Sequence, residues 1–127
     1  EDGKVVDYDA KKEKDTLKSL LETDEGSSRL GEIALISHES PISDLNILFY
    51  NTLFDENASC HMALGRAYPM NIKGGTAMDA ETLKANHANN SILHEDFMFG
   101  SADMHAVGIT YDGQEIDIIV DGNIKLD

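Results

Sequence analysis

The sequence has a single cysteine, Cys60, and no tryptophan among its 127 residues. One cysteine cannot form an internal disulfide, which agrees with a reducing compartment. No apolar run reaches the length of about 18 residues that a membrane-spanning helix needs, and no signal peptide is visible. We therefore expect a cytoplasmic chain that folds around a modest hydrophobic core.

Basic residues are also scarce, since 10 Lys and Arg stand against 24 Asp and Glu and leave a formal net charge of −14. Binding to nucleic acid or to an anionic membrane surface needs a basic surface, so the charge disfavours both partners. An acidic balance also fits a site that collects metal cations, but charge alone does not decide this. The glycine-rich segment KGGT is too short for a phosphate-binding loop.

The N-terminal residues carry a hairpin signal. Asp2-Gly3 favours a tight turn, and the following KVVDY predicts a strand over residues 4–9. A hairpin needs an incoming strand, yet only Glu1 precedes the turn. We therefore expect the chain to be the C-terminal piece of something longer. The alternative is an edge strand behind a trimmed start.

Short helices are predicted at three places. Residues 9–23 carry a narrow stripe of leucines among many charges, which is typical of a surface helix. Residues 40–59 favour a turn followed by one or two short helices, with Ser43 or Asp44 as the N-cap. The segment DAETLKAN, residues 79–86, is a further helix candidate within a long polar connection.

Strands are predicted over residues 29–37 and 60–69, and residues 93–101 favour a strand or a tight turn. The C-terminal stretch predicts a meander of strands joined by two Asp-Gly turns, at Asp112-Gly113 and Asp121-Gly122. We expect an α/β fold, with a mixed sheet, short helices and long loops, and one domain over residues 1–127.

Polar side chains interrupt the apolar strands at three points, and a buried charge is costly unless it is paired, hydrogen-bonded or bound to a metal. Glu32 lies in RLGEIAL, where it could pair with Arg29 or face solvent. His61 lies in SCHMALG and could be a core histidine with satisfied ring nitrogens. Cys60 beside it should point to the opposite face of the strand, so we interpret it as a small buried apolar residue.

His94 and Asp96 form the third point, in LHEDFMFG. Residues i and i+2 of a strand share a face, so the two side chains should converge. Such a pair suits a divalent metal, and it equally suits a simple ion pair. The other histidines, His38, His87 and His105, lack such a context, and we expect them to be structural.

Glu32, His61, His94 and Asp96 together offer nitrogen and oxygen ligands and no thiolate. This chemistry suits zinc, cobalt or manganese used for hydrolysis. Tyr68, in GRAYP, could stabilise the oxyanion of a tetrahedral intermediate. From its residue type and position alone, an ordinary half-buried loop tyrosine is the favoured interpretation.

The segments RLGEIALIS, LFDENASCHMALGRAYP and ILHEDFMFGS, in this order, resemble the thermophilic-type metalloaminopeptidases of peptidase family M29. The resemblance runs from about residue 26 to the C-terminus, where GITYDGQEIDIIVDGNIKL is similar to the end of the family. It implies that the chain is the C-terminal, metal-binding part of a larger peptidase domain.

By motif, the resemblance implies that Glu32 bridges two divalent metal ions and that Tyr68 is catalytic. It implies that His61, His94 and Asp96 are the other metal ligands in this chain. Glu56 could be an additional ligand, and Asn57 could shape its loop. Family members are longer and carry a further glutamate ligand in a segment that would precede Glu1.

The implied activity is the hydrolysis of N-terminal residues of peptides through a water activated by two metal ions. We expect peptide substrates, a homodimer when the protein is intact, and a fragment that is inactive alone. The alternatives are a non-catalytic structural or dimerisation fragment, and an acidic metal-binding module without hydrolase activity.

Overall fold

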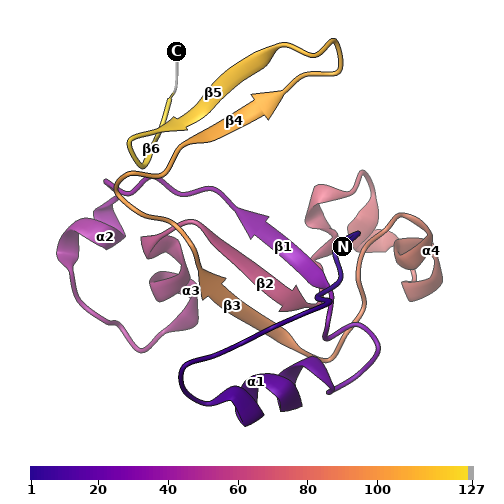
Figure 1. The fold of residues 1–127 in the computed structure, drawn as a ribbon. Coiled ribbons are helices and arrows are strands. Elements are labelled where there is room, and N and C mark those ends of the chain that lie inside the picture. Colours follow the sequence, from indigo (N-terminus) through magenta and orange to yellow (C-terminus); the bar gives the residue numbers. More distant parts are fainter. Residues whose placement is uncertain (126–127) are drawn as a thin grey trace. The chain divides into compact units, whose positions relative to one another are not determined.

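The computed structural model describes residues 1–125, and within them its helices and strands are short (Figure 1). The helices are α1 Lys14–Leu21, α2 Pro41–Leu45, α3 Thr52–Asp55 and α4 Ala80–Ala85, with 3-10 turns η1 Glu56–Ala58, η2 Pro69–Asn71 and η3 Gly75–Ala77. The strands are β1 Leu30–Ala34, β2 His61–Gly65, β3 His94–Met98, β4 Ala106–Ile109, β5 Glu115–Val120 and β6 Asn123–Ile124. The expected α/β class is confirmed.

The chain divides into two compact units, each built from two stretches of sequence. The first comprises Glu1–Ile33 and Met62–Asp96, and the second comprises Ala34–His61 and Phe97 onward. Most residues of the sheet β1-β2-β3 fall in the first unit, and the sheet β4-β5-β6 lies in the second. The expectation of a single domain stays a prediction.

In the first unit, β2 runs antiparallel to both of its neighbours. The Gly65 amide at the end of β2 donates to the Arg29 carbonyl just before β1, at 2.7 Å. The next amide, of Arg66, donates to the Leu93 carbonyl just before β3, also at 2.7 Å. Gly65 has a φ of +92°, and a Cβ there would collide with the Leu93 carbonyl oxygen. Only glycine therefore fits this junction of the three strands.

Two side chains fix the loops at this end of the sheet. Asn89 donates from Nδ2 to the carbonyls of Gly26, at 2.8 Å, and Gly65, at 2.5 Å. Asp24 accepts bonds from the Ser91 hydroxyl at 2.9 Å and the Ile92 amide at 2.8 Å. These contacts connect the α1–β1 loop to the segment that leads into β3.

In the second unit, β4 and β5 form the expected hairpin, with Gly108 opposite Ile116, and β5 pairs antiparallel with β6. The predicted C-terminal meander is confirmed. Ile119, in β5, is fully buried, whereas Ile109 in β4 is 75% exposed. The short helices predicted in residues 40–59 are also present, as α2 and α3.

The strand predicted over residues 4–9 is wrong. The tight turn exists, because Asp2 and Gly3 both have positive φ and the Lys4 amide donates to the Glu1 carbonyl at 2.9 Å. Beyond it, Lys4 makes only an isolated bridge to Arg29. A strand needs a partner along its length. Residues 5–9 have no such partner strand among the described residues, so the pairing ends at the Lys4 bridge.

Two helix details also differ from the predictions. Helix α1 begins at Lys14 and ends at Leu21, because Glu13 adopts a left-handed conformation with a φ of 54° and interrupts the helix predicted from residue 9. The N-cap of α2 is Ser40, whose hydroxyl accepts a bond from the Ser43 amide, so the N-cap predicted at Ser43 or Asp44 is wrong. Pro41 at the first helical position explains this start.

Candidate metal centre

Three of the candidate ligands lie on the sheet of the first unit. Glu32 is the middle residue of β1, and His94 and Asp96 are the first and third residues of β3. The burial of β3 alternates, so His94 and Asp96 turn to the covered side while Glu95 between them is exposed. The predicted convergence of the i and i+2 side chains is therefore present.

His94 lies close to both carboxylates without a tight bond to either. Its Nε2 is 3.5 Å from Asp96 Oδ1 and 3.8 Å from Glu32 Oε2. These distances exceed those of a charge-assisted hydrogen bond, which is about 2.7–2.9 Å long. The Asp96 side chain is 8% exposed, and its Oδ1 is buried without a hydrogen-bond partner. The three side chains thus lie close together at distances longer than direct hydrogen bonds.

A backbone contact fixes the tautomer of the neutral His94 ring. Its Nδ1 lies 2.7 Å from the Arg66 carbonyl oxygen. A carbonyl only accepts, so Nδ1 carries the hydrogen, and Nε2 of the neutral ring keeps its lone pair. That lone pair is on the nitrogen that faces the two carboxylates. This is the usual support of a metal-ligating histidine.

His61, at the start of β2, makes the same kind of contact between its Nδ1 and a backbone carbonyl. The residue is 2% exposed, and its Nδ1 lies 3.0 Å from the Ser59 carbonyl oxygen, so the neutral ring carries its hydrogen on Nδ1 and its lone pair on Nε2. Among residues 1–125, the ligand atoms of Glu32, His61 and Asp96 form a group that lies within 4.8 Å of one another. His94 is not a member of that group, but its Nε2 lies near the carboxylates of both Glu32 and Asp96.

The donor set fits a divalent metal ion. It consists of imidazole nitrogens and carboxylate oxygens, which zinc, cobalt and manganese accept. Asp96 Oδ1 gives the independent structural sign, because a buried carboxylate oxygen without a partner is costly in a folded protein. A cation would satisfy it.

Tyr68 lies beside these ligands, three residues after β2 ends. Its ring centroid is 4.7 Å from that of His94, with the planes tilted by 45°. The side chain is half exposed, so its hydroxyl can reach a molecule bound from solvent. The structure thus brings Tyr68 to His94, although its residue type and position alone favoured an ordinary loop tyrosine.

Other residues weighed from the sequence are not members of the ligand group that Glu32, His61 and Asp96 form. Asn57 donates to the Leu53 carbonyl at 2.9 Å, and Glu56 is not part of the ligand group found among residues 1–125. The Cys60 thiol is buried and lies 3.2 Å from the Ile36 carbonyl, which agrees with a structural residue. His105 forms an exposed pair with Asp117 at 2.8 Å.

Sequence reasoning missed the two carbonyls that orient the histidines, those of Ser59 and Arg66. Every residue has a backbone carbonyl, so the residue types at these two positions do not indicate a contact with a histidine ring. Only the strand geometry around His61 and His94 could have indicated them.

The fold and the cluster define a mixed α/β chain with a carboxylate–histidine site on a sheet. Residues 1–124 match the family model of the thermophilic metalloproteases, M29. The chain therefore belongs to this family. The match includes residues 1–25, which the motif resemblance did not cover.

Curated relatives agree. Aminopeptidase AmpS of Bacillus subtilis (strain 168) is 57% identical over 123 residues, which are 97% of this chain and 30% of that protein. Aminopeptidase 2 of Geobacillus stearothermophilus is 53% identical over 122 residues, or 96% of this chain and 30% of that protein. Aminopeptidase T of Thermus aquaticus is 40% identical over 119 residues, or 94% and 29%.

A solved structure, wild-type AmpT from Thermus thermophilus, shares the fold with a TM-score of 0.85 at 39% sequence identity. The alignment covers 98% of this chain and 30% of that structure. The chain thus spans 30% of the length of this structure and of the two Bacillus and Geobacillus relatives. No helix among residues 1–125 is long and apolar enough to cross a membrane.

Proposed function

We propose that this chain supplies most of the metal site of a metal-dependent aminopeptidase that removes N-terminal residues from peptides. Glu32, His61, His94 and Asp96 are the proposed ligands of two divalent ions, and Tyr68 is the proposed catalytic residue. Membership of the metalloprotease family supports the class, and the aminopeptidases among its relatives support the reaction. We propose that activity needs more than the residues in this chain. A cytoplasmic location stays a prediction.

One observation carries the proposal. Asp96 Oδ1 is buried, has no hydrogen-bond partner, and faces an imidazole nitrogen whose lone pair is free to coordinate. Glu32 and Asp96 both lie near His61 and near His94, although His94 is not in the His61 group. Two ions that share carboxylates need this kind of distribution. It is compatible with the two ions that the proposal assigns to the site.

The residues of the chain have distinct tasks in the proposed reaction. Divalent ions, when bound, supply Lewis acidity and an activated water for attack on the first peptide carbonyl. The Ser59 and Arg66 carbonyls contact Nδ1 of His61 and His94 and so leave Nε2 as the proposed ligand atom of each ring. This keeps the ligand geometry preorganised.

Tyr68 is placed to act on the substrate. Its half-exposed phenol lies beside His94, so its hydroxyl can donate a hydrogen bond to the oxyanion that develops during attack. A carboxylate that does not hold the metal ions would take the proton of the attacking water and pass it to the leaving amine. We propose that the free amino group of the peptide is received by acidic side chains, which restricts cleavage to the N-terminus.

A second role is favoured by the second unit. The β4–β5 hairpin exposes large apolar side chains, among them Ile109 and Tyr111. We propose a homodimer of the intact protein, in which such a surface is covered. A non-catalytic role in assembly is the alternative function. Sedimentation of wild type and Ile109→Lys tests it, and an unchanged oligomeric state would argue against a role of this hairpin.

The test of the metal site is a calorimetric titration of Zn²⁺ or Co²⁺ into this chain. We expect saturable binding that His94→Ala removes and that the matched variant His105→Ala retains. Binding that both variants retain, or that both lose, contradicts the site. Peptidase assays of the intact protein carrying Glu32→Gln or Tyr68→Phe then test the reaction. Wild-type turnover in Glu32→Gln contradicts the enzyme assignment, even if metal binds.

A further inference from the structure

A second candidate site lies in the first unit, apart from the proposed ligands. A cavity of about 400 Å³ is bordered by the α1–β1 loop, by α4 and by the segment that leads into β3. Its lining includes Arg66, whose carbonyl orients His94, and Ile92, which precedes His94 by two residues. One side of the cavity therefore lies close to His94, at the start of β3.

The cavity gathers basic side chains. Arg29, Arg66 and Lys84 line it, and we call these three residues the basic pocket. They are three of only 10 Lys and Arg in a chain with a net charge of −14. A cluster of cations in so acidic a chain is unlike the rest of its surface, where the acids outnumber the bases.

These cations are not committed to acids of the chain. Arg29 makes a single long hydrogen bond, from Nη1 to the Asp2 carbonyl at 3.4 Å. Among the ion pairs of residues 1–125, none involves Arg66 or Lys84, and neither side chain donates a hydrogen bond there. Their donors remain available to a ligand.

The acids in the lining do not compensate for them. Asp24 uses both oxygens in bonds from the amides of Gly26, Ser27 and Ile92 and from the Ser91 hydroxyl. Glu25, next to it, is exposed. The carboxylate of Asp24 is therefore occupied by its own loop, and none of the three cations lies in an ion pair with it.

We propose that the basic pocket binds the oxyanion group, carboxylate or phosphate, of a small ligand. Two guanidinium groups and an ammonium group provide the forked and point-charge donors that such groups accept. The volume suits a molecule of small-ligand size. If the proposed function holds, the C-terminal carboxylate of a short peptide is the natural source, and this choice of source alone rests on that function.

The experiment titrates three probes into this chain without added metal, followed by amide NMR shifts. The probes are an N-acetylated tripeptide with a free carboxylate, the same peptide as the C-terminal amide, and inorganic phosphate. The acetyl group removes the free amine, so binding does not depend on aminopeptidase chemistry. Failure of the proposed function therefore leaves this result unaffected.

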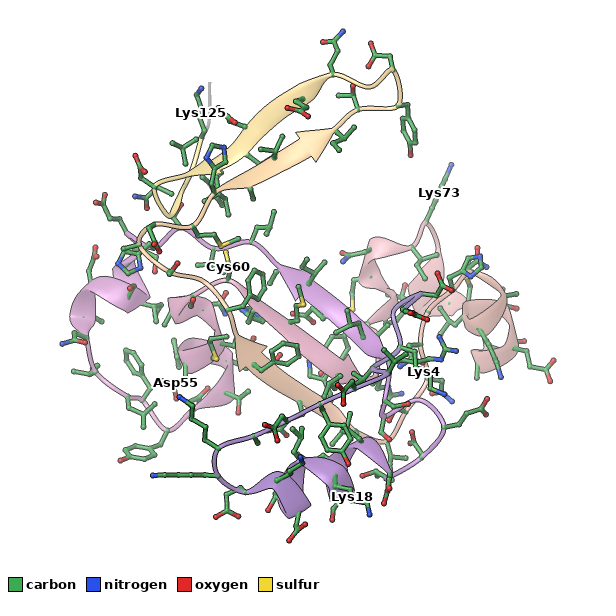
Figure 2. All side chains as sticks on the ribbon, in the orientation of Figure 1. Lys4, Lys18, Asp55, Cys60, Lys73 and Lys125 are labelled. Carbon is green, nitrogen blue, oxygen red and sulfur yellow. The ribbon has the colours of Figure 1, made fainter. Side chains whose placement is uncertain are left out.

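We expect saturable binding of an oxyanion to shift the amide NMR signals of residues 25, 66 and 90–92. Arg66→Gln should weaken binding by about tenfold or more, since a charge-assisted bond is lost. Lys18→Gln is the matched control, because Lys18 projects from α1 into solvent and only pairs with Glu22 at 3.9 Å (Figure 2). It should bind as the wild type does.

Binding of the free peptide but not of its amide supports the pocket and assigns it to carboxylates. Binding of phosphate alone supports the pocket and assigns it to phosphates. Absence of saturable binding by every probe overturns the proposal. Equal loss in Arg66→Gln and Lys18→Gln also overturns it, because the attraction would then be general. Should Arg66→Gln fail to fold, Lys84→Gln replaces it, with the same expected direction and a smaller loss.

Discussion

Two histidine–aspartate pairs of this chain have the same chemistry and opposite surroundings. His105 and Asp117 are about half exposed and lie 2.8 Å apart, as an ordinary hydrogen-bonded pair does. His94 and Asp96 are mostly covered, lie 3.5 Å apart, and leave a carboxylate oxygen without a partner. The exposed pair is complete by itself. The covered pair leaves Asp96 Oδ1 unsatisfied, as expected for the proposed metal ligands.

The difference teaches how to recognise a ligand pair. The side chains of an exposed pair are not constrained by packing, so they can adopt the geometry of a direct hydrogen bond. The covered pair is held apart by its surroundings, since the Arg66 carbonyl fixes one ring and the strand fixes the carboxylate. A buried group kept from its best contact is typical of a functional site.

The largest expected effect separates the two pairs by metal affinity. Asp96→Asn should reduce the affinity for Zn²⁺ by more than about a hundredfold, because loss of an outer-shell partner alone costs 10–100-fold. Without metal, the variant should be as stable as wild type or more stable, because an unsatisfied buried charge is gone. Thermal unfolding with and without Zn²⁺ measures both. Asp117→Asn is the control and should keep the metal-induced rise in Tm. An equal rise in Asp96→Asn would remove the distinction between the pairs.

The second effect tests whether the strand junction holds the covered pair in place. Gly65→Ala would drive a Cβ into the Leu93 carbonyl, directly before His94, at a φ of +92°. It should destabilise the chain by about 1–3 kcal/mol and weaken metal binding. Gly113→Ala is the control, because Gly113 has a φ of +83° in open space. Urea unfolding should show a smaller loss for it and no change in metal affinity.

Local patterns allowed most of the strands to be predicted. Alternation and the Asp-Gly turns placed β4, β5 and β6, and Asp79 with its following residues placed α4. The strand over residues 4–9 could not be excluded from sequence, because what it lacks is a partner along its length. The N-cap of α2 was missed because Ser40 before Pro41 competes with two equally good residues.

The candidate site was predictable only in part. The convergence of His94 with Asp96 followed from their spacing on one strand. That Glu32 comes within 3.8 Å of His94 is a long-range fact about strand order, which the sequence alone does not contain. The family resemblance grouped these residues before the geometry did. Their roles as ligands, and that of Tyr68 in catalysis, stay predictions.

A third prediction concerns a carboxylate that is satisfied, unlike Asp96. Hydrogen bonds from the Ile92 amide first, and then from Ser91, Gly26 and Ser27, hold the pKa of Asp24 below its ordinary value of 3.8. A lowered pKa in the folded chain means that Asp24 stabilises it above the ordinary value. This contribution is lost as the pH falls through the lower, folded pKa.

Urea unfolding from pH 7 to acid measures it. The stability difference between wild type and Asp24→Asn should be full near neutrality and should shrink below the ordinary carboxyl pKa. A difference for Asp24→Asn that grows toward low pH would reverse the sign of the assignment.

The smallest expected effect closes the comparison at the exposed pair. A double-mutant cycle of His105→Ala and Asp117→Asn should give a coupling of about 0.2–1 kcal/mol at low salt and pH 6, because both side chains are well solvated. The coupling should fall at 1 M salt, where charges on the surface are screened within about 3 Å. Urea unfolding of the four variants measures it. A salt-resistant coupling well above 1 kcal/mol would mean that the exposed pair is also constrained by its surroundings. The longer distance and the burial of the His94–Asp96 pair would then no longer be enough to distinguish it from the exposed pair.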